Sequence, residues 1–233
     1  SSLTSLDLST FNTQNVTNMS SMFSGCWRLK LLSLGNFNTQ KVKNMNSMFN
    51  GCSSLTNIDM SNFNTQKVSN MGNMFNGCSS IPVIDISKFN TRNVTDMSSM
   101  FANCRELNVI YAGNYWNTSN VAQGENMFSG CIKLNGERGT VYDANKTNNA
   151  YAHIDQGIDY PGYYSAILSH LRGDANGDGK ITIEDVDMIR SYLFGKLEYT
   201  YNRYGADVNQ DAKINTEDII YLIQYLKTGS FPK

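Results

Sequence analysis

Cysteine recurs at a nearly constant interval through the first 134 residues of the chain, at Cys26, Cys52, Cys78, Cys104 and Cys131. The intervals are 26, 26, 26 and 27 residues. A fixed period of this length is typical of proteins in which each repeat is one supersecondary unit stacked on its neighbours around a continuous core. The sequence therefore predicts about five repeats of 26 residues.

The stretch LTNIDMSNFNTQKVSNMGNMFNGC, from Leu55 to Cys78, is the clearest copy of the repeat. Apolar residues near its start suit a short strand with alternate side chains pointing inward. Apolar residues at spacings of three and four follow, and they predict a short helical turn behind the strand, at Val68, Met71, Met74 and Phe75. Each repeat is therefore expected to contain a strand and a short helix.

The cysteines are predicted to be small core residues. An odd number at regular spacing is a poor disulfide framework, and zinc would need cysteine pairs two to four residues apart. The methionines are predicted to fill the same core, at Met19, Met22, Met45, Met48, Met71, Met74, Met97 and Met100. The recurring FNT is predicted to be a turn whose Asn and Thr oxygens bond nearby backbone groups.

Outward strand positions carry Asp7, Asp59 and Asp85. Paired carboxylates can hydrolyse glycosides, but neighbouring strands about 4.8 Å apart would make these groups equivalent, with nothing to separate their pKa values. A repeat-built, calcium-dependent polysaccharide lyase would need Lys or Arg beside the carboxylates. The basic residues of the repeats fall on turns instead, so we expect binding, display or spacing and no catalysis.

The repeat pattern resembles the BspA-like leucine-rich repeats of bacterial surface and secreted proteins. The segment F-N-T-x-x-V-x-x-M-x-x-M-F-x-x-C, which carries the resemblance, recurs in full four times, and a fifth copy departs at Ala122 and Gly124. The resemblance implies an α/β leucine-rich-repeat solenoid over residues 1–134, closed by a C-terminal cap and connection over residues 135–171. Because the chain opens inside a repeat, we expect a fragment that lacks its export signal and N-terminal cap.

Two gap-free copies of one pattern follow, DANGDGKITIEDVDMI from Asp174 and DVNQDAKINTEDIIYL from Asp207. Calcium takes six to eight oxygen ligands, and a short loop supplies them at alternate positions. Loop one (residues 174–185) is predicted to bind one ion through Asp174, Asn176, Asp178, the Lys180 carbonyl and Asp185. Loop two (residues 207–218) is predicted to bind a second ion through Asp207, Asn209, Asp211, the Lys213 carbonyl and Asp218.

A helix is predicted after each loop. The first runs from about Ile183 to Phe194 and buries Val186, Ile189 and Leu193; the second buries Ile219, Leu222 and Leu226. Loop two has Ala212 where loop one has Gly179, and a left-handed backbone there costs an alanine about 1 kcal/mol, so weaker binding is expected. Phe231 is expected either to clasp back onto this segment or to lie in an unstructured tail.

The two loop–helix units resemble a type I dockerin, from Gly173 to about Gly229, because both loops end in Asp and the segment before Asp207 is a linker. The resemblance implies a small all-α domain over residues 172–233 that docks calcium-dependently on a cohesin module of a scaffoldin. The candidate cohesin-binding residues are carried over from the family's cohesin contacts, except Ile220, which lies beside them on the second helix. They are Ile183, Glu184, Arg190, Ser191, Gly195, Thr216, Glu217, Ile220, Ile223, Gln224 and Thr228.

The function expected on these grounds is a non-catalytic cellulosome component, secreted and attached to a cellulosome or to the bacterial surface. Its repeats are expected to bind a protein ligand that the sequence does not identify. The alternative is a carbohydrate-active cellulosomal subunit whose catalytic part lies outside this chain. The formal charge of −1 does not favour a nucleic-acid partner, and no apolar run approaches the roughly 18 residues of a membrane span.

Overall fold

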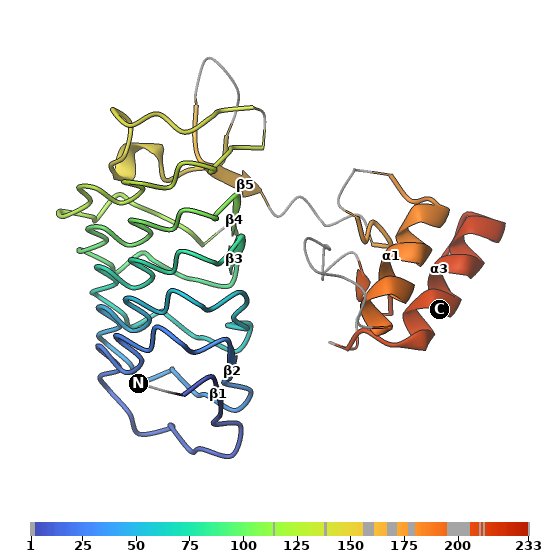
Figure 1. Ribbon diagram of the computed structural model, residues 1–233, viewed down its shortest axis with the longest axis horizontal. Coiled ribbons are helices and arrows are strands. Elements are labelled where there is room, and N and C mark those ends of the chain that lie inside the picture. Colours follow the sequence, from blue (N-terminus) through green and yellow to red (C-terminus); the bar gives the residue numbers. More distant parts are fainter. Residues whose placement is uncertain are drawn as a thin grey trace. The chain divides into compact units, whose positions relative to one another are not determined.

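The chain divides into two compact units, Ser1–Ala166 and Ile167–Lys233. A computed structural model (Figure 1) describes residues 3–113, 115–137, 139–155, 161–166, 172–176, 180–194, 206–209, 211 and 213–232. Each unit is described separately below.

The strands of the first unit are short and pair only with parallel neighbours. β1 (Ser5–Asp7) pairs with β2 (Leu31–Ser33), and β3 (Val83–Ile86) lies in a second sheet with β4 (Val109–Ala112) and β5 (Tyr164–Ala166). The register of both repeat-to-repeat pairs follows the sequence period, since Leu6 lies opposite Leu32 and Ile84 opposite Ile110. Paired strands of adjacent repeats are thus offset by one period of the sequence.

A second line of contacts joins the repeats away from the strands. Single parallel bridges connect one residue of each repeat with its counterpart in the next, at Asn18, Asn44, Asn70, Asp96 and Gln123. The FNT turns contribute as well: the Thr13 hydroxyl donates to the Asn38 carbonyl at 3.1 Å and accepts from the Asn38 amide at 2.8 Å. The Asn12 side chain accepts the amide of Gln14. The predicted bonding of the FNT oxygens to backbone is therefore confirmed.

The prediction of an α/β solenoid is wrong, because no helix is present in the described part of residues 3–134. This segment consists of turns, isolated bridges and two small parallel sheets. The residue before the second Met has φ near +56° in each repeat, at Ser21, Ser47, Asn73, Ser99 and Asn126. A left-handed residue interrupts an α-helix, and the amides around it bond to the next repeat, as from Phe49 to the Met74 carbonyl at 2.9 Å.

The core of the first unit runs through columns of equivalent side chains. Phenylalanine rings stack from repeat to repeat at centroid distances of 5.5 to 5.8 Å, through Phe23, Phe49, Phe75, Phe101 and Phe128. The cysteines are all free thiols, and four of them are buried, with Cys26 partly exposed. Each buried thiol donates to a phenylalanine carbonyl of an adjacent repeat, as from Cys78 to Phe49 at 3.2 Å. The predicted role of the cysteines as core residues is confirmed.

Burial is expected to keep four of the five thiols unreactive in the folded protein. Desolvation raises the pKa of Cys52 and Cys131 to about 12, and it raises the pKa of Cys78 and Cys104 as well. Because the thiolate is the reactive form, a thiol reagent at pH 8 should label only Cys26 quickly. Mass spectrometry measures the labels, with urea-unfolded protein as the control. Rapid labelling of all the thiols in folded protein would contradict the packing described.

The same thiols should make the first unit less stable in alkali. Their pKa is higher in the folded chain than in the unfolded one, where a thiol titrates near about 8.5. The stabilisation that the buried, neutral thiols provide is therefore complete below the pKa of a thiol in the unfolded chain. It is lost as the pH rises from 9 towards 12. The free energy of urea unfolding should fall across that window, and the fall should be shallower in Cys78→Ala.

The end of the first unit is closed by residues 135–155 and 161–166. They include η1 (Asn149–Tyr151), a short 3-10 helix, and β5, which pairs with β4. The buried carboxylate of Asp155 accepts the Thr140 hydroxyl at 2.7 Å, and the Phe128 amide donates to the Thr147 carbonyl at 2.9 Å. This segment thus supplies the acceptors that a further repeat would otherwise supply.

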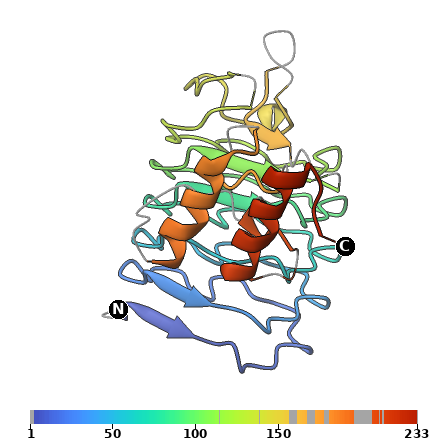
Figure 2. The ribbon, with the colours of Figure 1, turned by 90° about the vertical axis from the view of Figure 1, so that its right-hand side faces the viewer.

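The second unit contains α1 (Ile183–Leu193) and α3 (Thr216–Thr228), which lie side by side (Figure 2). Both helices begin with a capping box, and Gly229, with φ 72°, caps the C-terminal end of α3. Their shared core includes Val186, Ile189 and Leu222, as predicted, whereas Leu193 is half-buried and Leu226 is exposed. The remaining described residues are mostly loops, so the prediction of an all-α unit is also wrong. None of the described helices is long and apolar enough to cross a membrane.

Candidate functional site

Loop one is joined to the start of α1 by the carboxylate of Asp185. Asp185 is completely buried. One of its oxygens accepts the Asn176 amide at 3.0 Å, and the other accepts the Thr182 amide at 2.7 Å. The Thr182 hydroxyl accepts the Glu184 amide at 3.2 Å, which completes the cap of the helix. The last residue of the loop therefore fixes both the loop and the helix terminus.

Loop two repeats this arrangement. Asp218 is completely buried, and its oxygens accept the Asn209 amide at 3.1 Å and the Asn215 amide at 2.8 Å. Within the loop, the Asp211 amide donates to the side chains of Asp207 and Asn209, both at 3.1 Å. The structure thus brings four of the predicted ligand side chains of loop two into one hydrogen-bonded turn.

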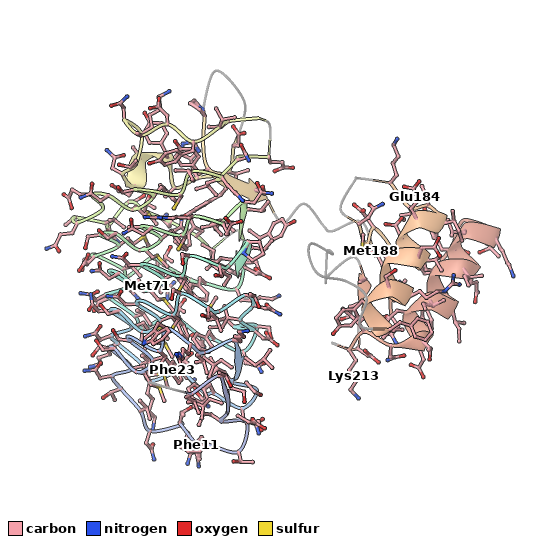
Figure 3. All side chains as sticks on the ribbon, in the orientation of Figure 1. Phe11, Phe23, Met71, Glu184, Met188 and Lys213 are labelled. Carbon is pink, nitrogen blue, oxygen red and sulfur yellow. The ribbon has the colours of Figure 1, made fainter. Side chains whose placement is uncertain are left out.

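The remaining predicted ligands lie in different settings. Asp174 is buried, whereas Lys180 and Lys213 are exposed (Figure 3 labels Lys213). The Lys213 amide donates to the Asp211 carboxylate at 2.8 Å. Asp178 lies outside the described residues, as do Gly179 and Ala212.

The chemistry of the two loops fits a hard divalent cation, because the donors are carboxylate, amide and carbonyl oxygens. Asp185 and Asp218 each accept one amide hydrogen on each oxygen, which leaves further lone pairs for an ion. In the described part of the chain, however, no group of three or more His, Cys, Asp or Glu residues is placed to hold a metal. The donor set fits calcium, while the carboxylates of the described residues do not by themselves form a metal-holding group.

The predicted cohesin-binding residues lie on or next to the two helices. Ile183 and Ile220 are exposed apolar side chains. Exposed polar side chains accompany them, at Glu184, Arg190, Thr216, Glu217, Gln224 and Thr228, and Ser191 and Ile223 are half-buried. Arg190 pairs with Asp187 at 2.9 Å, and the Thr228 hydroxyl donates to the Gln224 carbonyl at 2.9 Å. Gly195 lies outside the described residues.

Arg172 joins the two ends of this unit, a role that the sequence analysis missed. Its guanidinium lies 4.2 Å from the centroid of the Phe231 ring, and it donates to the Val208 carbonyl. Phe231 stacks on Tyr225 with a centroid distance of 4.4 Å. Of the two alternatives for Phe231, the structure shows the one that packs back onto the unit.

Removing this ring is expected to destabilise the second unit. Phe231→Ala loses the stacking on Tyr225 and the cation–π contact with Arg172, each worth about 0.5 to 2 kcal/mol. Thermal unfolding followed by circular dichroism at 222 nm measures the change, because the described α-helices all belong to this unit. Phe194→Ala, at an exposed ring, is the matched control. Equal effects of the two substitutions would contradict the role given to Phe231.

Three carboxylates that the sequence places on outward strand positions serve as turn acceptors, although only Asp7 and Asp85 lie in strands of the structure. Asp7, Asp59 and Asp85 each accept the amide two residues ahead, at 2.9, 3.0 and 2.8 Å. Backbone and side-chain hydrogen bonds from Ser9 lower the pKa of Asp7, whereas burial raises the pKa of Asp85. These bonds give the three aspartates a structural role in the turns.

Comparison with protein families gives two matches. The family described as "Mycoplasma protein of unknown function, DUF285" matches residues 1–111 and 56–157, and the Dockerin type I domain matches residues 172–227. The first match does not identify the repeats as leucine-rich repeats. A type I dockerin supports a cohesin-binding, cellulosomal role in general; such domains generally bind Ca²⁺, and their proteins are typically extracellular. No curated protein and no solved structure matches the chain.

Proposed function

Because the chain belongs to the DUF285 family and residues 172–227 match a type I dockerin, we propose that it is a non-catalytic, secreted component of a cellulosome. The dockerin binds a scaffoldin cohesin when calcium is bound, and the repeats bind a protein ligand. The dockerin match, coinciding with two equivalent loop–helix junctions at Asp185 and Asp218, is the observation that carries this proposal.

Calcium acts here by ordering two loops. Two ions are held by Asp174, Asn176, Asp178, the Lys180 carbonyl and Asp185, and by Asp207, Asn209, Asp211, the Lys213 carbonyl and Asp218. Bound calcium supplies the positive charge that compensates these carboxylates in each loop. Since Asp185 and Asp218 also cap α1 and α3, ion binding stabilises the helices that carry the docking side chains.

The docking surface combines exposed apolar and polar side chains of α1 and α3. Ile183 and Ile220, both exposed, suit the desolvated centre of an interface, where apolar anchors provide most of the binding energy. The equivalent helix positions differ, with Arg190 and Ser191 in α1 but Ile223 and Gln224 in α3. One docking orientation, with α3 at the centre, is therefore preferred over its twofold alternative.

The repeats act by binding and not by chemistry. The carboxylates of Asp7, Asp59 and Asp85 are hydrogen-bonded turn acceptors. Four of the five thiols are buried with the pKa raised by desolvation, which removes them as nucleophiles. These observations support a module that presents a surface to another protein.

A panel of immobilised cohesins and an array of plant polysaccharides test the proposal together. The full chain should bind at least one cohesin in millimolar calcium and should neither bind nor cleave the polysaccharides. Ile220→Asp should lose cohesin binding, and Leu226→Asp, also at an exposed position of α3, is the control. Cleavage or tight binding of a polysaccharide would instead identify a carbohydrate-active subunit.

A further inference from the structure

One segment of each repeat contains basic residues and no acidic ones. The equivalent segments are NTQNVT, NTQKVK, NTQKVS, NTRNVT and NTSNVA, which begin at Asn12, Asn38, Asn64, Asn90 and Asn117. None of them contains Asp or Glu, whereas together they contain Lys41, Lys43, Lys67 and Arg92. The side chains of these four residues are all exposed. We call these four residues the basic row.

The backbone of these segments is fixed by hydrogen bonds between successive repeats. The Lys43 amide donates to the Thr17 carbonyl at 2.8 Å, and the Lys43 carbonyl accepts the Ser69 amide at 2.9 Å. The Thr95 amide donates to the Ser69 carbonyl, also at 2.9 Å. Backbones paired in this way lie about 4.8 Å apart. The basic side chains therefore extend from a preformed scaffold, and a ligand does not have to order that backbone when it binds.

The basic row has no ion-pair partner in the described part of the chain. Lys41 donates instead to the neutral side chain of Asn15 at 2.7 Å. The acidic residue that is nearest along the chain, Asp96, is half-buried. Its carboxylate accepts the Asn70 side chain and the Ser98 amide, both at 2.9 Å. The positive charge of the basic row is thus available to carboxylates of a ligand, which would relieve the repulsion between its members.

We propose that the basic row docks an acidic, extended segment of the protein that the repeats bind. Lys41 and Arg92 belong to repeats two steps apart, so they are separated along the array by about 10 Å. An extended segment of about three residues covers this distance, so consecutive acidic residues complement the basic row. This inference rests on the proposed function, because it assigns the chemistry of the protein ligand.

The composition of the same segments disfavours other polyanions. None of the segments contains Phe, Trp or Tyr. Proteins that bind single-stranded nucleic acids combine positive charge with aromatic rings on which the bases stack. These segments likewise offer no ring on which a sugar could stack, so an acidic peptide fits the basic row better than a nucleic acid or an acidic polysaccharide.

Fluorescence anisotropy of a labelled peptide tests the proposal. A short polyglutamate peptide is titrated with the full chain in calcium at physiological ionic strength, and it should bind. The double variant Lys41→Glu, Lys67→Glu should bind the peptide at least about tenfold more weakly, because like charges across an interface repel each other. Peptide binding by the unmodified chain should also weaken as salt is added, since exposed charges are screened.

The double variant Lys30→Glu, Arg105→Glu is the matched control. It changes the net charge by the same amount at exposed residues outside the basic row, and it should weaken peptide binding less than about threefold, because charges beyond the Debye length are screened. No binding of the peptide, or equal losses in the two double variants, would overturn the proposal. Tighter binding of polygalacturonate than of polyglutamate would overturn it as well, in favour of a polysaccharide.

Cohesin binding, measured on the same samples, separates this inference from the proposed function. The variant with Lys41→Glu and Lys67→Glu should bind cohesin as the unmodified chain does. If the unmodified chain binds cohesin but not the acidic peptide, the inference about the basic row fails and the proposed role of the dockerin stands. Absence of cohesin binding by the unmodified chain would instead count against the proposed function.

Discussion

Replacing Asp185 by Ala is expected to abolish calcium binding in loop one and to weaken cohesin binding by at least about 100-fold, because even partners of a metal ligand are worth 10- to 100-fold. The substitution removes a proposed ligand and two further bonds at once. The Asn176 and Thr182 amides lose their acceptor, so the loop and the cap of α1 lose their connection. Isothermal titration with calcium should show a single site, the weaker one of loop two, instead of two sites.

Asp187→Ala is the matched control for this prediction. Asp187 lies two residues further along the helix, is exposed, and pairs only at the surface with Arg190 at 2.9 Å. A surface pair of this kind is worth about 1 kcal/mol or less, so calcium binding should change less than about twofold. If Asp185→Ala bound two calcium ions as the unmodified chain does, loop one would not be a calcium site.

Phe75→Ala is expected to lower the free energy of unfolding of the first unit by about 3 to 5 kcal/mol. The ring is completely buried and stacks on Phe49 and Phe101 at 5.5 and 5.7 Å. Its removal leaves a cavity between three neighbouring repeats. Urea unfolding followed by fluorescence measures the loss.

Phe11→Ala is the control for Phe75→Ala, because the Phe11 ring is exposed. It should cost less than about 1 kcal/mol, as surface substitutions usually do. A loss as large as that of Phe75→Ala would contradict the exposure of the Phe11 ring.

The repeat period predicted the register of the first unit but not its secondary structure. A residue spacing of three and four, as in Val68, Met71 and Met74, fits a helix, yet it also fits a chain whose inward residues are separated by tight turns. Whether the segment forms a helix or a series of tight turns depends on where its backbone amides bond. Asn73 has a left-handed backbone, and the Phe75 amide bonds to the next repeat, a long-range contact that periodicity within one repeat does not encode.

The second unit was more predictable because its signals are local. The sequence predicted the start of α1 at Ile183, where the structure begins the helix. The capping boxes are also local features of the sequence, TIED from Thr182 and NTED from Asn215. No local sequence pattern indicates the role of Arg172, because its contacts are with Val208 and Phe231, more than 30 residues away. The predicted cohesin contacts come from resemblance and stay predictions.

The most direct test of the account is the affinity of the full chain for a cohesin, measured in calcium and again after chelation. The two loops contain buried carboxylates at Asp185 and Asp218 that also cap the helices of the docking surface. Cohesin binding should be tight with calcium, at least about 100-fold weaker after chelation, and restored when calcium is added back. Undiminished cohesin binding in the chelator would contradict the account.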